Sequence, residues 1–293
     1  MDKIFKPMKL SFSTNAFVEY PLPEAIEKIA GIGYEGVEIL ADAPHLYPFS
    51  TSTADLAKVL TALEKGRLQV SNINANTAAG YYQCSPGKMF WEPLFEPSLA
   101  NPDADARGWR IEFTKKCIDL ARSLSCPNVS ITSGRMVPGV SPDKSMEYLK
   151  GSLDEVLDYA AASNVRIGME YEPGLLVERF EELDALIREI GARNFGANLD
   201  LGHSHVLREN PWEVIRGLSS RIFHVHLEDI RAGKHYHLIP GEGDVRFEVL
   251  LRALESVAYE GFLTVELYTY PGAPEQAAGK AFDYLNKLLA GQD

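Results

Sequence analysis

The sequence has no run of 18 uncharged apolar residues and only three cysteines among its 293 residues. The first absence argues against a membrane-spanning helix, and the N-terminal segment MDKIFKPMKLSFST lacks the apolar stretch of a signal peptide. Cys84, Cys117 and Cys126 form no CxxC pair and cannot all pair with one another. We therefore expect a cytoplasmic protein with reduced thiols, and the cysteine spacing excludes a thiolate-rich zinc site.

A basic excess is also absent, because 29 Lys and Arg residues stand against 41 Asp and Glu residues, for a net charge of −12. Proteins that work on a phosphate backbone usually present a basic face. The charge balance therefore disfavours a nucleic-acid partner, although a locally basic face would be compatible with it. The remaining composition is that of an ordinary globular protein, with 45% apolar residues.

Short β-rich runs alternate along the chain with segments in which apolar residues recur at helical spacing. The eight runs cover residues 9–14, 36–40, 68–74, 128–132, 165–171, 195–200, 221–227 and 262–268. Helical spacing appears at 21–33, 54–66, 112–124, 144–164, 180–191, 247–261 and 279–291, and Asn210-Pro211 announces a further short helix. Strict βα alternation predicts a parallel sheet, and eight units predict a single (β/α)8 (TIM) barrel domain over residues 1–293. A doubly wound sheet is the competing architecture, but the GxGxxG and GxxxxGK[ST] motifs that usually follow its first strand are missing.

One connection is much longer than the others. The third predicted strand ends near Asn74 and its helix begins near Trp109, and the segment between them, residues 75–106, contains several prolines and the aromatic residues Tyr81, Tyr82, Phe90, Trp91 and Phe95. Loops of this length are more often functional than idle, and this one leaves the carboxyl end of a strand, where TIM barrels carry their active sites. We expect a lid that packs over the site. A surface excursion or an oligomer contact remains the alternative.

Acidic and imidazole side chains gather at the ends of the last four predicted strands. They are Glu170 and Glu172 in MEYE, Asp200 and His203 in NLDLGHSH, His224, His226 and Glu228 in HVHLED, and Glu266 in VELY. Strand carboxyl ends converge on one pocket in such a barrel. Taken singly, such residues are often a solvated acid or a hydrogen-bonded core histidine. Together they suit a divalent ion of intermediate hardness, Mn²⁺ or Mg²⁺, with Co²⁺ as an alternative.

The motifs GMEYEP, NLDLGHSH, HVHLED followed by PGEGDV, and TVELY occur in this order on these strands. With them the chain resembles the xylose isomerase-like TIM barrels, the sugar phosphate isomerase/epimerase superfamily. The ketose 3-epimerase branch of that superfamily holds one divalent ion with a Glu, an Asp, a His and a Glu. Matched by motif, the resemblance implies that Glu170, Asp200, His226 and Glu266 are the metal ligands here. Mn²⁺ or Mg²⁺ is expected, with Co²⁺ or Zn²⁺ as alternatives.

The resemblance also implies an activity. Glu170 and Glu266 would be the catalytic acid/base pair of a sugar or polyol-ketone isomerase or epimerase, which moves a proton through a metal-stabilised enediolate. The histidine of the family's D-x-x-H motif, which contacts substrate, falls on His203, while His205 is expected to be structural or to support a ligand. His237 precedes the glycine-rich turn and is expected to contact substrate.

Two further residues are weaker candidates for substrate binding. Arg231 lies near the place of a substrate-binding arginine of the epimerases, but its spacing is off by one. Glu38 faces the pocket by its position at the end of the second strand; a buried acid that is hydrogen-bonded within the barrel is the equal alternative.

Other activities remain open. Dehydration of a cyclic polyol or acid, of the inosose or dehydroshikimate type, uses a similar metal and similar carboxylates. An endonuclease IV-like nuclease is a remote alternative, because it needs histidines after the third and fourth strands, where this chain has Asn72, Asn74 and Asn76, and Thr132 and Ser133. We expect a small sugar or polyol substrate, unphosphorylated because no phosphate cradle is visible. A homodimer or homotetramer is usual in the family.

Overall fold

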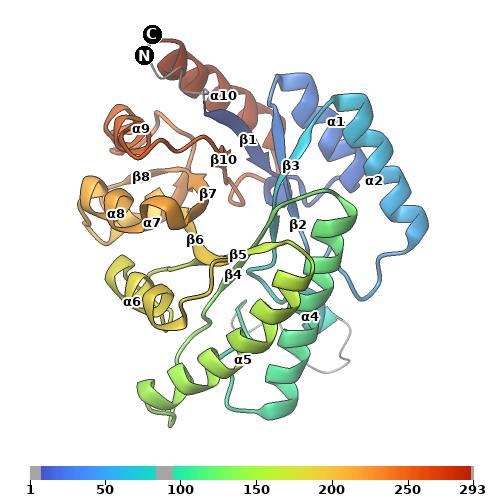
Figure 1. The fold of residues 1–293 in the computed structure, drawn as a ribbon. Coiled ribbons are helices and arrows are strands. Elements are labelled where there is room, and N and C mark those ends of the chain that lie inside the picture. The colour runs from blue at the N-terminus through green and yellow to red at the C-terminus, as the bar shows by residue number, and fades with distance from the viewer. Residues whose placement is uncertain (1–7, 84–94, 292–293) are drawn as a thin grey trace.

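The strands form a closed parallel barrel in the computed structural model, which describes residues 8–83 and 95–291 (Figure 1). Neighbouring strands follow the order β1-β10-β7-β6-β5-β4-β3-β2, and β2 pairs with β1 to close the barrel. All eight pairings are parallel. The barrel strands are β1 (Lys9–Ser13), β2 (Gly36–Leu40), β3 (Gln69–Asn74), β4 (Asn128–Thr132), β5 (Arg166–Glu170), β6 (Phe195–Asp200), β7 (Ile222–Leu227) and β10 (Phe262–Val265). The predicted (β/α)8 barrel is therefore confirmed.

Helices follow the strands and surround the barrel (Figure 1). The α-helices are α1 (Leu22–Ile32), α2 (Thr53–Gly66), α3 (Ala79–Gln83), α4 (Ala104–Ser123), α5 (Pro142–Ala162), α6 (Phe180–Ile190), α7 (Leu201–Val206), α8 (Pro211–Leu218), α9 (Phe247–Ser256) and α10 (Pro274–Ala290), and the short 3₁₀ helices are η1 (Thr14–Phe17) and η2 (Ser219–Arg221). Because helices cover the sheet from outside and side chains fill it from inside, β2, β4, β6 and β7 are buried along their whole length. This explains why the strands appear in the sequence as nearly continuous apolar runs.

The connection after β3 differs from its expected form. Two helical segments interrupt it: α3, and the first part of α4, which begins at Ala104 because the Asp103 side chain accepts a hydrogen bond from the Ala106 backbone N–H. The Tyr81 ring packs on Trp109 of α4 at a centroid distance of 4.6 Å, and Trp109 stacks on Phe113 at 5.2 Å. Phe90 and Trp91 of the proposed lid lie outside the described residues. Closure of this segment over the site stays a prediction.

The connection after β7 is a hairpin rather than an irregular loop. β8 (Asp229–Arg231) pairs antiparallel with β9 (Lys234–Leu238). The glycine-rich turn that follows is fastened to the start of the hairpin, because the Asp229 carboxylate accepts hydrogen bonds from the backbone N–H groups of Gly241, Gly243 and Val245 at 2.8–3.0 Å. This arrangement fixes the position of β9, whose His237 points back to the barrel.

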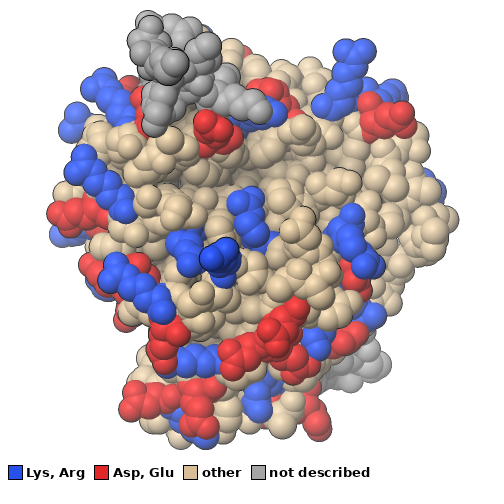
Figure 2. Space-filling model, in the orientation of Figure 1, with Lys and Arg blue, Asp and Glu red and all other residues tan. Residues whose placement is uncertain are grey.

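Charged side chains of both signs are interspersed over the helices on the face shown in Figure 2. Ion pairs join neighbouring helices, such as Lys115 with Glu155 and Lys150 with Glu189. Exposed pairs of this kind contribute little to stability, so the hydrophobic core and the barrel hydrogen bonds hold the fold. Within residues 8–83 and 95–291, no helix combines the length and the apolar character that crossing a membrane requires.

Candidate active site and metal centre

Four side chains from four neighbouring strands meet at the carboxyl end of the barrel. They are Glu170 at the end of β5, Asp200 at the end of β6, His226 in β7 and Glu266 directly after β10. All four are buried, and each can offer one ligand atom to a group of atoms that lie within 4.8 Å of one another. The register of the sheet contributes directly, because Asp200 of β6 is paired with His226 of β7. The structure thus brings together the four residues that the motifs single out as ligands.

The spacing of these atoms fits ligands around one cation. His226 Nδ1 lies 3.5 Å from Glu170 Oε2, 3.8 Å from Glu266 Oε2 and 3.9 Å from Asp200 Oδ2. Metal–ligand bonds of about 2.0–2.2 Å place neighbouring ligand atoms about 3–4 Å apart. In addition, Asp200 Oδ2 is buried without a hydrogen-bond partner among the described residues. A buried carboxylate oxygen needs a partner, and a divalent cation amid three carboxylates and one imidazole would supply it.

Asparagine side chains fix the two glutamates. One oxygen of Glu170, Oε2, accepts hydrogen bonds from Asn76 Nδ2 at 2.7 Å and from Asn198 Nδ2 at 2.6 Å. The other oxygen, Oε1, lies 3.7 Å from the nearest imidazole nitrogen, too far for a hydrogen bond. The carboxylate is therefore held through one oxygen, and the second remains available.

Glu266 is also held through one oxygen, but here the oxygen without amide hydrogen bonds is the one that faces His226, whereas in Glu170 the doubly bonded Oε2 faces it. Its Oε1 accepts hydrogen bonds from Asn15 Nδ2 at 2.9 Å and from Asn74 Nδ2 at 3.1 Å, which leaves Oε2 facing His226. Burial raises the pKa of Glu266 well above its usual range, and the charge of Glu170 adds to the effect against the opposing influence of His226. A role for asparagine side chains in holding the glutamates was not predicted. For Asn74 and Asn76 the sequence carries a signal, the N-x-N-x-N pattern of residues 72–76, since alternate residues of a strand share one face.

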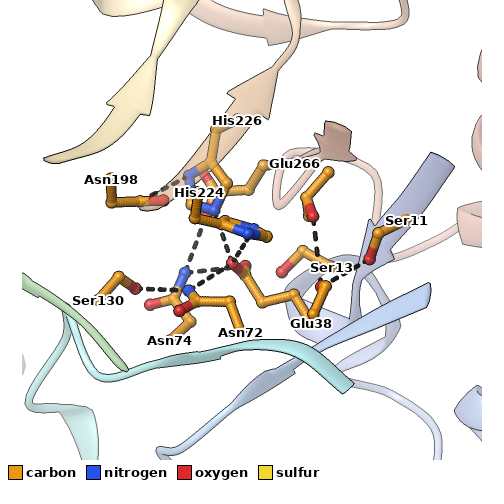
Figure 3. A network of polar contacts seen from close by, with 12 residues as sticks. Ser11, Ser13, Glu38, Asn72, Asn74, Ser130, Asn198, His224, His226 and Glu266 are labelled. Atoms are coloured by element: carbon orange, nitrogen blue, oxygen red, sulfur yellow. Dashed lines mark hydrogen bonds and ion pairs between the residues drawn. The ribbon is translucent and has the colours of Figure 1, made fainter. Parts of the chain in front are cut away.

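His226 is anchored from below by Glu38 of β2 (Figure 3). Its Nε2 donates to Glu38 Oε2 at 2.6 Å, so that Nδ1 faces the three carboxylates, where Asn198 Nδ2 also lies 3.3 Å away. Although burial alone would raise the pKa of Glu38, the neighbouring His226 and His224 hold that pKa well below its usual range. Burial likewise opposes protonation of His226, but the surrounding carboxylates hold the pKa of His226 well above its usual range. Glu38 is fully buried and does not line the pocket. The structure therefore agrees with the alternative expectation, a buried acid hydrogen-bonded within the barrel, and not with a substrate contact.

The segment NLDLGHSHV has a local structural role as well. Asp200 Oδ1 accepts a hydrogen bond from the His203 backbone N–H at 2.7 Å and so caps α7. This helix has six residues and is too short to be recognised from the periodicity of apolar residues. His203 is buried, and its Nδ1 donates to the Tyr171 carbonyl at 3.1 Å, which turns Nε2 toward Asp200 Oδ2 at 3.8 Å. His205 points elsewhere: it is half-buried and lines a separate cavity of about 350 Å³ beside α8 and α9.

The hairpin β8–β9 contributes further imidazoles. His237 is buried, and its Nδ1 donates to the Glu266 carbonyl oxygen at 2.8 Å. Burial lowers the pKa of His237 to about 3, so this imidazole is neutral. Its Nε2 lies 3.3 Å from Nε2 of His235. Arg231 does not reach this group, because its side chain is exposed and its guanidinium donates to the carbonyl oxygen of Glu242.

A cavity of about 520 Å³ opens above the four converging residues, within the usual range for a small-molecule site. Both glutamates of the cluster, Glu170 and Glu266, line it together with His203, His235 and His237. Its other lining residues are Asn15, Val18, Leu40, Ala43, Asn74, Asn76, Thr77, Ala79, Phe95, Arg135, Glu172 and Tyr268. Phe95, from the described end of the proposed lid, is thus part of the cavity wall. Burial raises the pKa of the Glu172 carboxyl group to about 7.

Glu228 is a buried acid that lies beside Asp200 and His237. Both of its carboxylate oxygens lack hydrogen-bond partners among the described residues, and one lies so close to Gly202 that a Cβ there would overlap it. Burial, followed by the charge of Asp200, raises the pKa of Glu228 well above its usual range.

Known proteins with similar sequences convert sugars or related compounds. Fructoselysine 3-epimerase of Shigella flexneri is 23% identical over 287 residues, which cover 96% of this chain and 98% of the relative. 2-Oxo-tetronate isomerase of Pectobacterium atrosepticum is 26% identical over 283 residues, with coverages of 92% and 95%. Inosose dehydratase of Geobacillus thermodenitrificans is 27% identical over 167 residues, 50% of this chain and 56% of the relative. Two of these three relatives, the epimerase and the isomerase, support an enzyme with isomerase or epimerase activity.

Solved structures share the fold over nearly the whole chain. A D-tagatose 3-epimerase-like protein superposes with a TM-score of 0.80 at 22% identity, covering 97% of both chains. The IOLI protein, solved with a bound zinc atom, gives a TM-score of 0.78 at 20% identity and covers 97% of this chain and 99% of its own. On this chain itself, the buried carboxylates and imidazole lie close enough together to hold one divalent metal ion. The sequence model of one protein family matches residues 26–288, and the chain therefore belongs to the xylose isomerase-like TIM barrel family.

Proposed function

We propose that this protein is a divalent-metal-dependent isomerase or epimerase of a small sugar or polyol ketone. Glu170, Asp200, His226 and Glu266 would hold the ion. The observation that carries the proposal is the spacing of these four side chains around the buried, unpartnered Asp200 Oδ2. Three carboxylates and one imidazole suit Mn²⁺ or Mg²⁺, with Co²⁺ or Zn²⁺ as alternatives.

Two glutamates of the cluster are suited to proton transfer. Glu170 ends β5, and Glu266 comes directly after β10. Because β6 and β7 lie between these two strands in the barrel, the two carboxylates enter the cavity from different directions. Each is held through one oxygen by two amide N–H groups, and its second oxygen accepts no hydrogen bond from the part of the chain that the structure describes. A carboxylate fixed in this way can meet a substrate proton without first reorganising.

The reaction follows from this arrangement. One glutamate takes the proton from the carbon next to the carbonyl; the C–H bond breaks, its electron pair enters the enediolate, and the proton stays on a carboxylate oxygen. A divalent cation bound at the cluster would stabilise the negative charge that develops on the substrate oxygens. If the other glutamate returns a proton to the opposite face of the same carbon, the product is an epimer. If a proton is returned to the neighbouring carbon and the hydroxyl proton moves from one substrate oxygen to the other, the carbonyl group changes carbon and the product is an isomer.

Histidines of the cavity would orient the substrate. His203 and His237 line the cavity, and each donates Nδ1–H to a backbone carbonyl oxygen, which fixes the ring and leaves Nε2 as the nitrogen that would contact substrate hydroxyl groups. The exposed position of Arg231 gives it no part in the proposal.

Dehydration is the second candidate, and the similarity to inosose dehydratase favours it. The same proton abstraction would begin that reaction, but a hydroxyl group on the adjacent carbon would then leave as water.

Both candidates can be tested with the Mn²⁺-loaded protein and a panel of ketoses, keto acids and inososes in D₂O. Deuterium at the carbon beside the carbonyl, seen by NMR with a new epimer or isomer, supports the proposal. A product lighter by one water supports the dehydratase, and the absence of metal-dependent turnover or exchange across the panel contradicts both.

A further inference from the structure

Glu38 lies beneath the proposed metal centre rather than in the cavity. It is carried by β2, whereas His226 is carried by β7, and β1 and β10 separate these strands in the barrel. The Glu38 side chain therefore reaches across the barrel interior to contact His226 (Figure 3). It is fully buried. An ionised carboxylate is costly to bury without partners. The groups that donate hydrogen bonds to Glu38 therefore indicate its role.

Each Glu38 oxygen is bound on a different side. Oε2 accepts hydrogen bonds from His226 Nε2 at 2.6 Å and from Asn72 Nδ2 at 2.8 Å, and Oε1 accepts one from Asn74 Nδ2 at 3.1 Å. Asn72 is itself tied to Ser130 Oγ at 2.9 Å. The carboxylate therefore cannot rotate without breaking several charge-assisted hydrogen bonds.

These contacts determine which imidazole nitrogen faces the carboxylates. Since His226 Nε2 donates to Glu38, only Nδ1 is directed at Glu170, Asp200 and Glu266. A carboxylate that accepts from the far nitrogen of a metal-binding histidine fixes the ring and makes it a more basic ligand.

A second link runs from Glu38 to another ligand. The Asn74 amide group donates to both Glu38 Oε1 and Glu266 Oε1, each at 3.1 Å. One buried acid is thus connected directly to His226 and, through one shared amide, to Glu266.

We propose that Glu38 is a positioning residue of the metal centre, which sets the orientation of His226 directly and that of Glu266 through Asn74. The inference rests on the proposed function, since it assigns Glu38 a part in the same site. It differs from a substrate contact, because the side chain does not reach the cavity. It also differs from a purely structural role, which would change the stability of the fold and leave cation affinity unaltered.

The test compares Glu38→Gln with the wild-type protein in the absence of substrate. Titrations of metal-free protein with Mn²⁺ and Co²⁺ against a chelating dye give the affinity, and the visible absorption of bound Co²⁺ reports the ligand geometry. Glutamine can still accept from His226, but it loses the charge, and its NH₂ group must face an asparagine NH₂ group. We expect a 10- to 100-fold weaker affinity and a changed Co²⁺ spectrum.

Glu96→Gln is the matched control. Glu96 is also buried and accepts hydrogen bonds from Ser98 N, Asn101 Nδ2 and Arg135 N at 2.8–3.1 Å, but it has no bond to the four clustered residues. Its cation affinity and Co²⁺ spectrum should be those of the wild type. If Glu38→Gln does not fold, Glu38→Asp takes its place: it keeps the charge but withdraws the carboxylate by about 1.5 Å, one C–C bond.

The outcomes separate this inference from the proposed function. If the wild type binds one cation and both Glu38 variants bind it equally tightly with an unchanged spectrum, Glu38 has no positioning role, while the metal site stands. If the wild type binds neither Mn²⁺ nor Co²⁺, the proposed function fails, and the positioning role fails with it.

Discussion

Arg110 offers the sharpest prediction about how the fold supports the site. It is fully buried, and its guanidinium donates to the carbonyl oxygens of Ala75 at 3.0 Å, Asn76 at 2.6 Å and Thr77 at 2.8 Å. These carbonyl groups belong to the turn that leaves β3 and carries the Asn76 side chain to Glu170. The α4 helix therefore holds one wall of the site through a single side chain.

The expected cost of removing the guanidinium can be worked from these contacts. Replacing Arg110 by Met leaves the Ala75 and Thr77 carbonyl oxygens without their donor and leaves that of Asn76 with only a long 3.5 Å hydrogen bond from Thr132 Oγ1. Each orphaned group costs about 1–3 kcal/mol. The variant no longer bears the desolvation cost of a buried guanidinium, and this offsets part of the destabilisation. We expect Arg110→Met to lower the free energy of unfolding by roughly 3–6 kcal/mol, a large part of the roughly 5–15 kcal/mol that stabilises a typical protein.

The assay is equilibrium unfolding in urea, followed by both tryptophan fluorescence and circular dichroism. Arg107→Met in the same helix is the control, because half-buried Arg107 makes one backbone hydrogen bond, to the Asn101 carbonyl oxygen at 2.6 Å. It should cost about 1 kcal/mol. If Arg110→Met is no more destabilised than Arg107→Met, Arg110 does not hold the turn as described.

Three further predictions concern the site itself. Glu266→Gln should abolish turnover while the melting temperature stays close to that of the wild type, since a proposed base and ligand is lost without added bulk; wild-type turnover in this variant would refute the mechanism. His203→Ala should reduce kcat/KM more than His205→Ala, because only the first lines the cavity, and equal losses would show that this division is wrong. Gly202→Ala should destabilise the protein by about 1–3 kcal/mol in urea unfolding, since its Cβ would overlap a buried carboxylate oxygen. Gly151→Ala, where a Cβ meets nothing within 4 Å, should be neutral or slightly stabilising.

The parts of the fold that depend on local pattern could be predicted from the sequence. The strands are apolar runs because both sides of a barrel strand are buried, and β2, β4 and β6 lie at the expected residues. Helix α8 begins at Pro211, as the pair Asn210-Pro211 indicated, and the Asn210 side chain accepts a hydrogen bond from the Trp212 backbone N–H. The ligand candidates could be chosen because strand order alone brings the carboxyl ends of β5, β6, β7 and β10 to one place.

What the sequence could not show are pairings between distant residues. Glu38 and His226 are separated by 188 positions, and nothing local distinguishes an acid that supports a ligand from one that contacts substrate. Arg110 would ordinarily be assigned to the surface, since arginine is rarely fully buried. The β8–β9 hairpin was not predicted either, because its two strands are short and polar and carry no apolar pattern that distinguishes them from a loop.

The most direct test of the account is metal analysis of the purified protein after equilibration with Mn²⁺ and removal of free ions. The wild type should retain one divalent ion per chain, and the Glu170→Gln/Asp200→Asn variant, folded by circular dichroism, should retain none. Equal metal content in the two proteins, or no bound ion in the wild type, would contradict the assignment of the four converging side chains as a metal centre.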